Sequence, residues 1–215
     1  MENKPTAVSQ VPSIFPTAYF PSLTLMAAMV QTSDLLTEIY ETFPKQTHRN
    51  RTVILTANGP MTLSVPVVRP NGNHTLTADI TVAYTERWNV THWRAIESAY
   101  SAAPYFLYYR DPIEKLLMAK YDRLITLNEA LLEALFKALK SDCTIRHTDN
   151  YIRNAACSHD YRDRFSYKRP DINVTLPPYT QVFCDRQAFD GNVSILDLLF
   201  NKGPEAKDYL LQIKL

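Results

Sequence analysis

The spacing of apolar residues at the start of the chain predicts a strand, a helix and a second strand. Val11–Phe20 mixes prolines with large apolar side chains, which favours a short edge strand turning at Pro21, because proline is kept out of central strands. Ser22 is placed to cap a helix that runs to about Gln31 with apolar residues on one face. A strand is expected over Asp34–Tyr40. This order is typical of a β-α-β unit with parallel strands.

A β-hairpin is predicted in the next part of the chain. Two β-rich runs, Thr52–Ala57 and Met61–Val68, are joined by Asn58 and Gly59. Asn and Gly adopt positive φ readily, so this pair is the strongest short signal for a hairpin turn. Thr75–Tyr84 then alternates apolar and polar positions, which predicts a strand with one buried face and one solvated face.

The second half of the chain has helical spacing. Thr91 is predicted to cap a helix that ends before Pro104, because the residue preceding proline disfavours the α conformation. Asp111 and Thr126 each begin a sequence typical of a helix start. The helix after Thr126 carries a leucine stripe, which is either core or a partner surface, and core is the commoner outcome. Ser194 is expected to cap a further helix.

Residues 140–167 show no clear periodicity, and no element is predicted there. Short strands are expected over Asp171–Leu176 and Gln181–Cys184, and Gly203 and Pro204 end the helix that Ser194 begins. Together these patterns predict an α/β fold: a mixed β-sheet with an N-terminal β-α-β-like unit, a β-hairpin and a helical C-terminal half. An α+β fold is the alternative.

Composition is that of a globular protein of one domain. The chain has 215 residues, of which 46% are hydrophobic and 21% charged, so we expect a single domain over 13–215 after a flexible N-terminus at 1–12. The net charge of +1 gives no global field to attract nucleic acid, and none is expected as a partner. No apolar run approaches the roughly 20 residues of a membrane helix. No signal sequence is recognisable, so a soluble cytoplasmic protein is expected.

Cysteine and glycine usage argues against several kinds of site. Cys143, Cys157 and Cys184 are odd in number and widely spaced, which disfavours a disulfide framework and a metal site, even with His147 and His159 nearby. The four glycines have neither Rossmann nor P-loop spacing, and no cofactor is expected. No serine or cysteine stands in a known nucleophile motif, so a covalent acyl-enzyme is not predicted.

Hydrogen-bond donors are densest between Glu38 and Ile54. Arginine presents a planar fork that suits carboxylate or phosphate, and histidine titrates near neutral pH. Glu38 and Glu41 are the nearby anions, so the segment has a local positive excess. It is predicted to be an anion-binding loop, although a solvated connection between strands is the plain alternative. The donors are Lys45, Gln46, His48, Arg49, Asn50 and Arg51.

This loop and three further blocks resemble the WbqC-like family. The blocks are Tyr19-Phe20-Pro21 with Lys45–Arg51, Trp88 with His92–Ile96, Tyr100 with Ala103–Phe106, and Asn192–Phe200 with Gly203-Pro204. They occur in the family's order and span most of the chain. Members of the family are associated with surface-polysaccharide gene clusters. The resemblance therefore implies a role in transferring glycine or another aminoacyl group to a sugar.

The chain departs from the family pattern at two places. Family members have a Gly-Tyr pair just after Phe-Pro, similar to a turn of nucleotidyltransferase folds, whereas this chain has Thr24 and Leu25. The difference weakens a nucleotidyl-transfer interpretation. Family members also tend to carry a longer, glycine-containing segment in the region of residues 140–167.

A candidate site follows from the loop and the family blocks. His48 and His92 are the candidate proton handlers, with Glu41 as an orienting carboxylate, although a structural histidine is the commoner outcome. An aromatic set would stack on a sugar face or else pack in the core, and core is favoured for Phe106 and at least one tyrosine. The set is Tyr100, Tyr105, Phe106, Tyr108 and Tyr109. Candidate anion- or substrate-binding residues are Lys45, Gln46, Arg49, Asn50, Arg51, Tyr19, Trp93, Tyr100 and Tyr105.

Two functions remain open on the sequence. The first is a transferase of surface-polysaccharide biosynthesis, in which Lys45, Arg49 and Arg51 hold an anionic small-molecule donor, such as a nucleotide sugar or an aminoacyl donor. In that mechanism a sugar amine or hydroxyl attacks directly while a histidine or glutamate accepts its proton. The second is a non-catalytic binding or assembly protein that recognises a phosphorylated glycan precursor or a protein partner. The sequence carries no signal for the oligomeric state.

Overall fold

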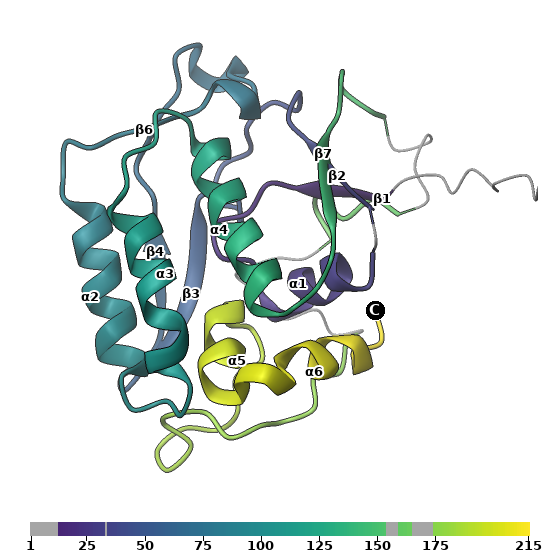
Figure 1. Cartoon of the computed structure of the whole chain (residues 1–215). Coiled ribbons are helices and arrows are strands. Elements are labelled where there is room, and N and C mark those ends of the chain that lie inside the picture. The colour runs from purple at the N-terminus through teal and green to yellow at the C-terminus, as the bar shows by residue number, and fades with distance from the viewer. Residues whose placement is uncertain (1–12, 33, 154–158, 165–173) are drawn as a thin grey trace, which may run out of the picture.

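A parallel sheet lies at the centre of the β-α-β unit. The computed structural model describes residues 13–32, 34–153, 159–164 and 174–215 (Figure 1), so the predicted flexible residues 1–12 lie outside the described part. Strands β1 (Ser13–Pro16), β2 (Asp34–Glu38) and β7 (Thr144–His147) pair in the order β1-β2-β7, all parallel. Helix α1 (Leu23–Val30) connects β1 to β2. The predicted β-α-β unit is confirmed.

Strand β7 comes from the segment for which the sequence predicted no element. It pairs with β2 in the register Leu35↔Ile145 and forms an edge of the sheet. Its sequence, Thr-Ile-Arg-His, has a single apolar residue, and Arg146 and His147 are exposed. An edge strand of this polarity carries too weak a pattern to be recognised before its partner is known.

The predicted hairpin is present. Strands β3 (Arg51–Thr56) and β4 (Gly59–Ser64) are antiparallel, and Gly59 has a φ of 102° at the turn. Two shorter strands, β5 (Val67–Val68) and β6 (Thr81–Val82), form a further antiparallel pair. The fold is therefore mixed α/β as predicted, with its parallel and antiparallel strands divided among separate small sheets.

The predicted strand over Thr75–Tyr84 is wrong. The chain forms short 3-10 helices at Gly72–His74 and Thr77–Asp79, and only Thr81–Val82 is β-structure. Thr75 and Thr77 are buried rather than solvated. The hydroxyl of Thr75 accepts a hydrogen bond from the N–H of Asn71 at 2.9 Å, a local bond that competes with strand pairing.

The helices were predicted more accurately at their ends than at their starts. Thr91, Asp111 and Thr126 lie inside helices rather than at N-caps, and these three predicted starts are wrong. Pro112 lies inside its helix, where its missing N–H leaves the carbonyl of Tyr108 without a helical donor, at a residue that is 77% exposed. The helices are α2 (Trp88–Tyr100), α3 (Phe106–Met118), α4 (Leu124–Ala138), α5 (Ile195–Lys202) and α6 (Ala206–Gln212).

The C-terminal region also differs from the prediction. Gln181–Cys184 forms a turn, so the strand predicted there is wrong. Of the strand predicted over Asp171–Leu176, residues 171–173 lie outside the described part and residues 174–176 have no regular structure. Ser194 does cap α5, because its side chain accepts a hydrogen bond from the N–H of Leu196.

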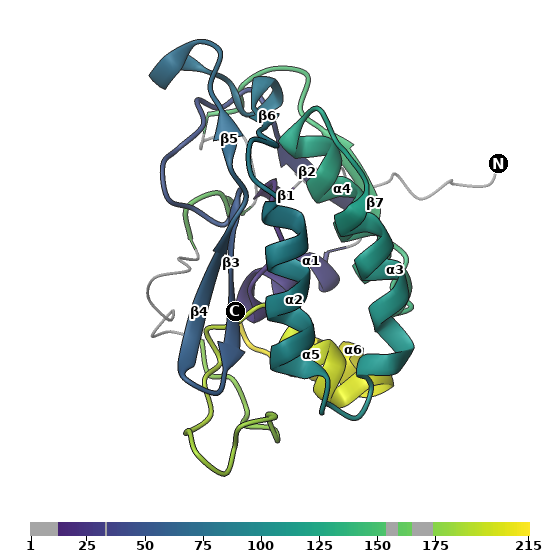
Figure 2. The same cartoon turned by 90° about the vertical axis from the view of Figure 1, so that its left-hand side faces the viewer.

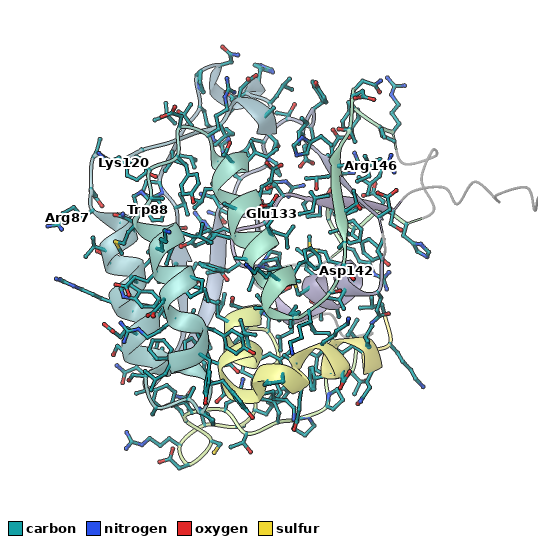
Figure 3. The ribbon with its side chains drawn as sticks, in the orientation of Figure 1. Arg87, Trp88, Lys120, Glu133, Asp142 and Arg146 are labelled. Atoms are coloured by element: carbon teal, nitrogen blue, oxygen red, sulfur yellow. The ribbon has the colours of Figure 1, made fainter. Side chains whose placement is uncertain are left out.

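One hydrophobic cluster runs through the described elements. Helices α2 and α3 lie side by side, with α2 against the β3–β4 hairpin, while α5 and α6 pack against α1 (Figures 1 and 2). The leucine stripe of α4 is buried in this cluster rather than presented as a surface. Charged side chains such as Arg87 and Arg146 extend at the periphery, whereas Trp88 is buried (Figure 3). In the described part of the chain, no helix has both the length and the apolar character needed to cross a membrane.

Candidate functional site

A pocket of about 480 Å³ lies beyond the carboxyl ends of the parallel strands. The lining residues between positions 40 and 44 follow β2, and Tyr151 follows β7. Asp163 comes from the segment that bridges to β1. Open α/β sheets bind their ligands outside the carboxyl ends of their strands, so this is the expected position for a site. We call it the Tyr40–Tyr151 pocket, and it is lined by Tyr40, Glu41, Thr42, Pro44, Tyr151 and Asp163.

A buried ion pair forms one side of this pocket. The Nε and Nη2 atoms of Arg49 donate to the two carboxylate oxygens of Glu41 at 2.6 and 2.8 Å, and Arg49 is 1% exposed. Nη2 also donates to the main-chain oxygen of Arg162 at 3.3 Å. The main-chain oxygen of Arg49 accepts from Asn128 on α4 at 2.8 Å. Arg49 therefore joins the segment after β2 to α4 and to residues 160–162.

A second buried carboxylate lies at the end of β2. Glu38 is 0% exposed and accepts hydrogen bonds from the N–H of Tyr40 at 2.8 Å and of Ile152 at 2.9 Å. The hydroxyl of Thr148 donates to it at 2.9 Å, and Nη1 of Arg162 lies 3.5 Å away. These contacts fix the segment after β7 against the segment after β2, which sets the width of the pocket.

The charged residues of the described lining are two carboxylates, Glu41 and Asp163. Burial raises the pKa of Glu41, the bonds from Arg49 oppose that rise, and the nearby charge of Asp163 adds to it. The pKa of Asp160 is lowered, chiefly by its hydrogen bonds with Arg162. Four carboxylates face two guanidinium groups here: Glu38, Glu41, Asp160 and Asp163 against Arg49 and Arg162.

Two tyrosine rings supply the apolar surface of the pocket. Tyr151 is 50% exposed, and its ring lies under the guanidinium of Arg162, whose Cζ is 5.2 Å from the ring centroid. That contact holds the ring in place by a cation–π interaction. Tyr40 is 38% exposed. The pocket thus combines exposed aromatic rings with carboxylates and the hydroxyl of Thr42.

The two predicted histidines, His48 and His92, are buried. Burial, assisted by the charge of Arg49, lowers the pKa of His48 to about 4. Burial also lowers the pKa of His92 to about 4, opposed by a hydrogen bond with the backbone of Ser64. Nδ1 of His92 is 2.9 Å from the hydroxyl of Tyr19. Both rings are therefore neutral at pH 7, and neither belongs to the described lining of the Tyr40–Tyr151 pocket.

The predicted aromatic residues pack in the interior. Tyr19, Trp93 and Tyr100 are buried, and Trp93 stacks on Phe106 with 6.1 Å between ring centroids. The hydroxyl of Tyr100 accepts a hydrogen bond from the N–H of Leu55 at 3.1 Å. Tyr105 is half-buried. Core packing is the alternative that these contacts favour, and a role in stacking on a sugar stays a prediction.

The polar residues of the predicted loop lie in different environments, some exposed and some bonded within the fold. Lys45 and Gln46 are exposed next to Pro44, a lining residue of the pocket, and Gln46 has a φ of 57°. Asn50 donates to the main-chain oxygen of Val65 at 2.9 Å. Arg51 is half-buried at the start of β3. Their role in binding an anion stays a prediction, with Lys45 and Gln46 as its surface-exposed members.

Several lining residues were not found from the sequence. Glu41 is the one predicted site residue in the described lining, whereas Tyr40, Tyr151 and Asp163 were not predicted. Tyr151 and Asp163 lie in the segment 140–167, whose strand was not recognised. The strand order could have led to these residues, because residues that follow the carboxyl ends of parallel strands gather at one edge of the sheet.

The described residues contain no cluster of three or more His, Cys, Asp or Glu side chains that could hold a metal ion. Cys143 is half-buried and Cys184 is exposed, and both are free thiols. Cys157 lies outside the described residues.

Comparison with known proteins gives the chain a family. The family model described as the WbqC-like protein family matches residues 17–162 and 143–209, and the two matches overlap within the segment 140–167. An uncharacterized protein of Mycobacterium tuberculosis, Rv1507c, is 31% identical over 193 residues, covering 78% of this chain and 83% of the relative. No solved structure matches the chain. The family blocks found in the sequence are therefore not a chance similarity, and the chain belongs to the WbqC-like protein family.

Proposed function

We propose that this protein is a transferase of surface-polysaccharide biosynthesis, and that its sugar acceptor binds in the Tyr40–Tyr151 pocket. The observation that carries the proposal is the position of Glu41. This carboxylate lines the pocket, is 8% exposed, and has a pKa raised by burial. A raised pKa makes a carboxylate a better proton acceptor near neutral pH, as general base catalysis requires.

The size and lining of the pocket support a sugar as the ligand. Its volume of about 480 Å³ lies within the range of roughly 300–1,000 Å³ that is usual for small-molecule sites. Tyrosine rings offer an apolar face with a polar tip, and carboxylates accept hydrogen bonds from hydroxyl or amino groups. Because the charged residues of the described lining, Glu41 and Asp163, are both carboxylates, we propose an acceptor that carries an amino group.

The proposed reaction is a direct acyl transfer. The acceptor's amino or hydroxyl group loses its proton to Glu41 as its nitrogen or oxygen bonds to the carbonyl carbon of an activated aminoacyl ester. The ester C–O bond breaks, and the leaving oxygen takes up the proton from Glu41. Arg49 is a positioning residue in this scheme, because both of its contacts with Glu41 fix the carboxylate.

Two other residues keep proposed roles. Lys45 is exposed beside the pocket, where its charge can attract an anionic substrate, such as an aminoacyl ester that carries a phosphate group or the phosphates of a nucleotide sugar acceptor. His48 is the second candidate proton acceptor, because its ring is neutral at pH 7; its pKa of about 4 makes it a weaker base than an exposed histidine. Free thiols at Cys143 and Cys184 fit the reducing cytoplasm as the proposed compartment.

A non-catalytic role in binding a glycan precursor is the second candidate. One observation favours it: both carboxylate oxygens of Glu41 are already bonded to Arg49, at 2.6 and 2.8 Å. A carboxylate held in this way is better suited to accept one more hydrogen bond from a ligand than to take up a proton, because protonation weakens the ion pair.

Replacing Tyr151 with Ala tests the sugar pocket. We expect the variant to fold normally and to bind glucosamine several-fold more weakly than the wild type in calorimetric titrations, because it loses an exposed aromatic face. Tyr108→Ala is the matched control, since Tyr108 is 77% exposed on α3 and lies outside the pocket. Equal glucosamine affinity for the two variants would remove the pocket from the proposal.

A thermal-shift screen of aminoacyl donors and nucleotide sugars first identifies a ligand that can serve as the second substrate. Turnover assays with that ligand, together with the glucosamine titrations, then separate the two candidate functions. A transferase that uses His48 should lose turnover and keep glucosamine binding in the His48→Ala variant. If that variant retains turnover, His48 is not the proton acceptor and Glu41 remains. The non-catalytic role requires that the wild type form no product with any donor that binds.

A further inference from the structure

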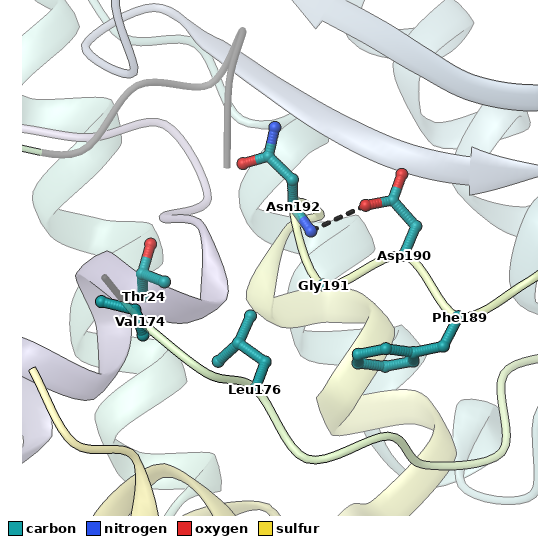
Figure 4. Close-up of a pocket in the computed structure, with 7 residues that line it drawn as sticks. All are labelled: Thr24, Val174, Leu176, Phe189, Asp190, Gly191 and Asn192. Carbon is teal, nitrogen blue, oxygen red and sulfur yellow. Dashed lines mark hydrogen bonds between the residues drawn. The ribbon is translucent and has the colours of Figure 1, made fainter. Parts of the chain in front are cut away.

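A second pocket lies at the first turn of α1 and shares no described lining residue with the Tyr40–Tyr151 pocket. Its volume is about 280 Å³. Figure 4 shows Thr24 and Val174 on one side of the hollow, Asp190 and Asn192 on the other, and the side chain of Leu176 between them. We call it the Thr24–Phe189 pocket, and it is lined by Thr24, Val174, Leu176, Phe189, Asp190, Gly191 and Asn192.

The wall that carries Asp190 is fixed by hydrogen bonds. The buried side chain of Gln181 accepts from the N–H of Asp190 at 3.0 Å and donates to its main-chain oxygen at 2.9 Å. Gln181 also donates to the carboxylate of Asp197 at 2.9 Å, and Asp197 is 0% exposed. The position of Asp190 is therefore set from inside the protein before any ligand binds.

The carboxylate of Asp190 retains acceptor capacity. Its Oδ1 accepts a hydrogen bond from the N–H of Asn192 at 2.8 Å, drawn as a dashed line in Figure 4. A carboxylate has about four lone-pair sites, so one such bond leaves others for a ligand. Among the described lining residues, Asp190 is the charged one.

Much of the remaining lining is apolar. Gly191 allows the side chain of Leu176 to pack against the main chain, since a Cβ atom at position 191 would lie 2.5 Å from Cδ1 of Leu176. The ring of Phe189 is held edge-on to Tyr179 with 5.2 Å between centroids. Val174 completes this surface.

We propose that the Thr24–Phe189 pocket binds a small molecule with a primary ammonium group on a short apolar body. The ammonium group pairs with Asp190, and the apolar body lies against Leu176 and Phe189. The volume is just below the roughly 300–1,000 Å³ of sites for drug-sized ligands, which fits a fragment of the size of one amino acid. This site is separate from the proposed function and does not depend on it.

Leucine methyl ester and its N-acetyl derivative are a matched pair of probes. They share the apolar body and the ester, and only the first has an ammonium group. A charged hydrogen bond in a partly buried site is worth roughly a tenfold change in affinity or more. We expect calorimetric titration of the full chain to give roughly tenfold tighter binding of leucine methyl ester than of the N-acetyl ester. Equal binding of the two esters, or binding of neither, would overturn the proposal.

The variant Asp190→Asn tests the role of the carboxylate without removing the turn. Asparagine keeps an Oδ1 acceptor for the N–H of Asn192 but has no charge. We expect this variant to bind leucine methyl ester about as weakly as it binds the N-acetyl ester. Asp185→Asn is the control, because Asp185 has a side chain 67% exposed and lies outside the lining. It should leave both affinities unchanged.

A second variant closes the pocket. In Gly191→Ala the new Cβ atom displaces the end of the Leu176 side chain, a flexible group, and φ at Gly191 needs no special conformation. We expect a folded protein that binds neither ester. Wild-type binding of leucine methyl ester by this variant would contradict the site. Tyr151→Ala should leave leucine methyl ester binding unchanged, so this inference and the proposed function can fail separately.

Discussion

At the scale of single residues, burial decides what a charged side chain does. In the sequence Arg49 belongs to a basic loop and is predicted to bind an anion. In the fold its guanidinium is buried and occupied by Glu41 and by the main-chain oxygen of Arg162. Lys45, four residues earlier, is exposed. Composition cannot distinguish these two cations, because it gives no information on which one meets a buried carboxylate.

We expect Arg49→Ala to destabilise the protein strongly. Removing one partner of a buried ion pair leaves the other charge uncompensated, which costs about 3–5 kcal/mol. Urea denaturation would measure the change in the free energy of unfolding. Arg146→Ala is the control: this arginine pairs with Asp34, but its side chain is 57% exposed, so its loss should cost within about 1 kcal/mol.

A stable Arg49→Ala variant with the unfolding free energy of the wild type would mean that Arg49 does not clamp Glu41. It would return Arg49 to the role of an anion ligand at the loop surface. The same result would weaken the proposal that Glu41 is held in a defined position in the pocket.

Of the residues that line the Tyr40–Tyr151 pocket, Glu41 was predicted from the sequence, and others were missed for a physical reason. Glu41 was found because it lies in the donor-rich segment. Tyr151 was missed because it contributes only an exposed ring at the end of a polar edge strand, and its stacking with Arg162 is visible only in three dimensions. His48 and His92 were recognised as titratable residues, but their burial and low pKa values depend on packing.

At the scale of elements, local signals were reliable where the cap residue itself makes the bond. Ser22 and Ser194 cap α1 and α5 through their own side chains, as their sequences predict. Asp111 and Thr126 have the same local chemistry but lie inside longer helices. There, the apolar residues that precede them, Phe106 and Leu124, are buried and extend the helix by tertiary packing.

Gly203 ends α5 and packs against Tyr105, just before α3, so its replacement by Ala should lower the free energy of unfolding. A Cβ atom there would lie 2.4 Å from the ring of Tyr105, just before α3, and φ is 54° at the end of α5. Gly72 is a matched control, because its φ is 55° and a Cβ atom would meet nothing within 4 Å. Gly72→Ala should cost about 1–2 kcal/mol for the left-handed backbone alone. Gly203→Ala should cost about 1–3 kcal/mol more, since the overpacking adds to it, as does a ψ of −120° that lies outside the left-handed helical region.

Urea denaturation would measure the loss of unfolding free energy in Gly72→Ala and in Gly203→Ala. Equal losses of unfolding free energy would show that the contact between Gly203 and Tyr105 adjusts freely. In that case the junction between α3 and α5 would not be a tightly packed feature of the fold.

At the scale of the whole molecule, topology assembles the pocket from distant parts of the chain. Tyr40 and Tyr151 are far apart in sequence, yet parallel pairing of β2 with β7 ends both strands at the same edge of the sheet. The sequence predicted the β-α-β unit, the hairpin and the mixed α/β class. It could not predict that the third parallel strand comes from residues 144–147, because strand pairing at such separation leaves no trace in a single sequence.

The distribution of charge also emerges only at this scale. The chain as a whole is nearly neutral, with a net charge of +1, and the loop before β3 is locally basic. The charged lining residues of the folded pocket are nevertheless carboxylates, because Glu41 follows β2 and Asp163 comes from the segment that bridges to β1, while Arg49 and Arg162 are occupied in ion pairs. This reversal is what changes the proposed ligand from an anion held by arginines to an amino sugar held by carboxylates and tyrosine rings.

The central claim is that the Tyr40–Tyr151 pocket binds an amino sugar, and a titration of ¹⁵N-labelled protein with glucosamine, followed by NMR, tests it most directly. The account predicts that the amide resonances of residues 40–43, together with those of residues 148–152, shift progressively and saturate, and that glucose produces smaller shifts at the same positions. Shifts confined to other parts of the chain, or an unchanged spectrum at saturating glucosamine, would contradict it.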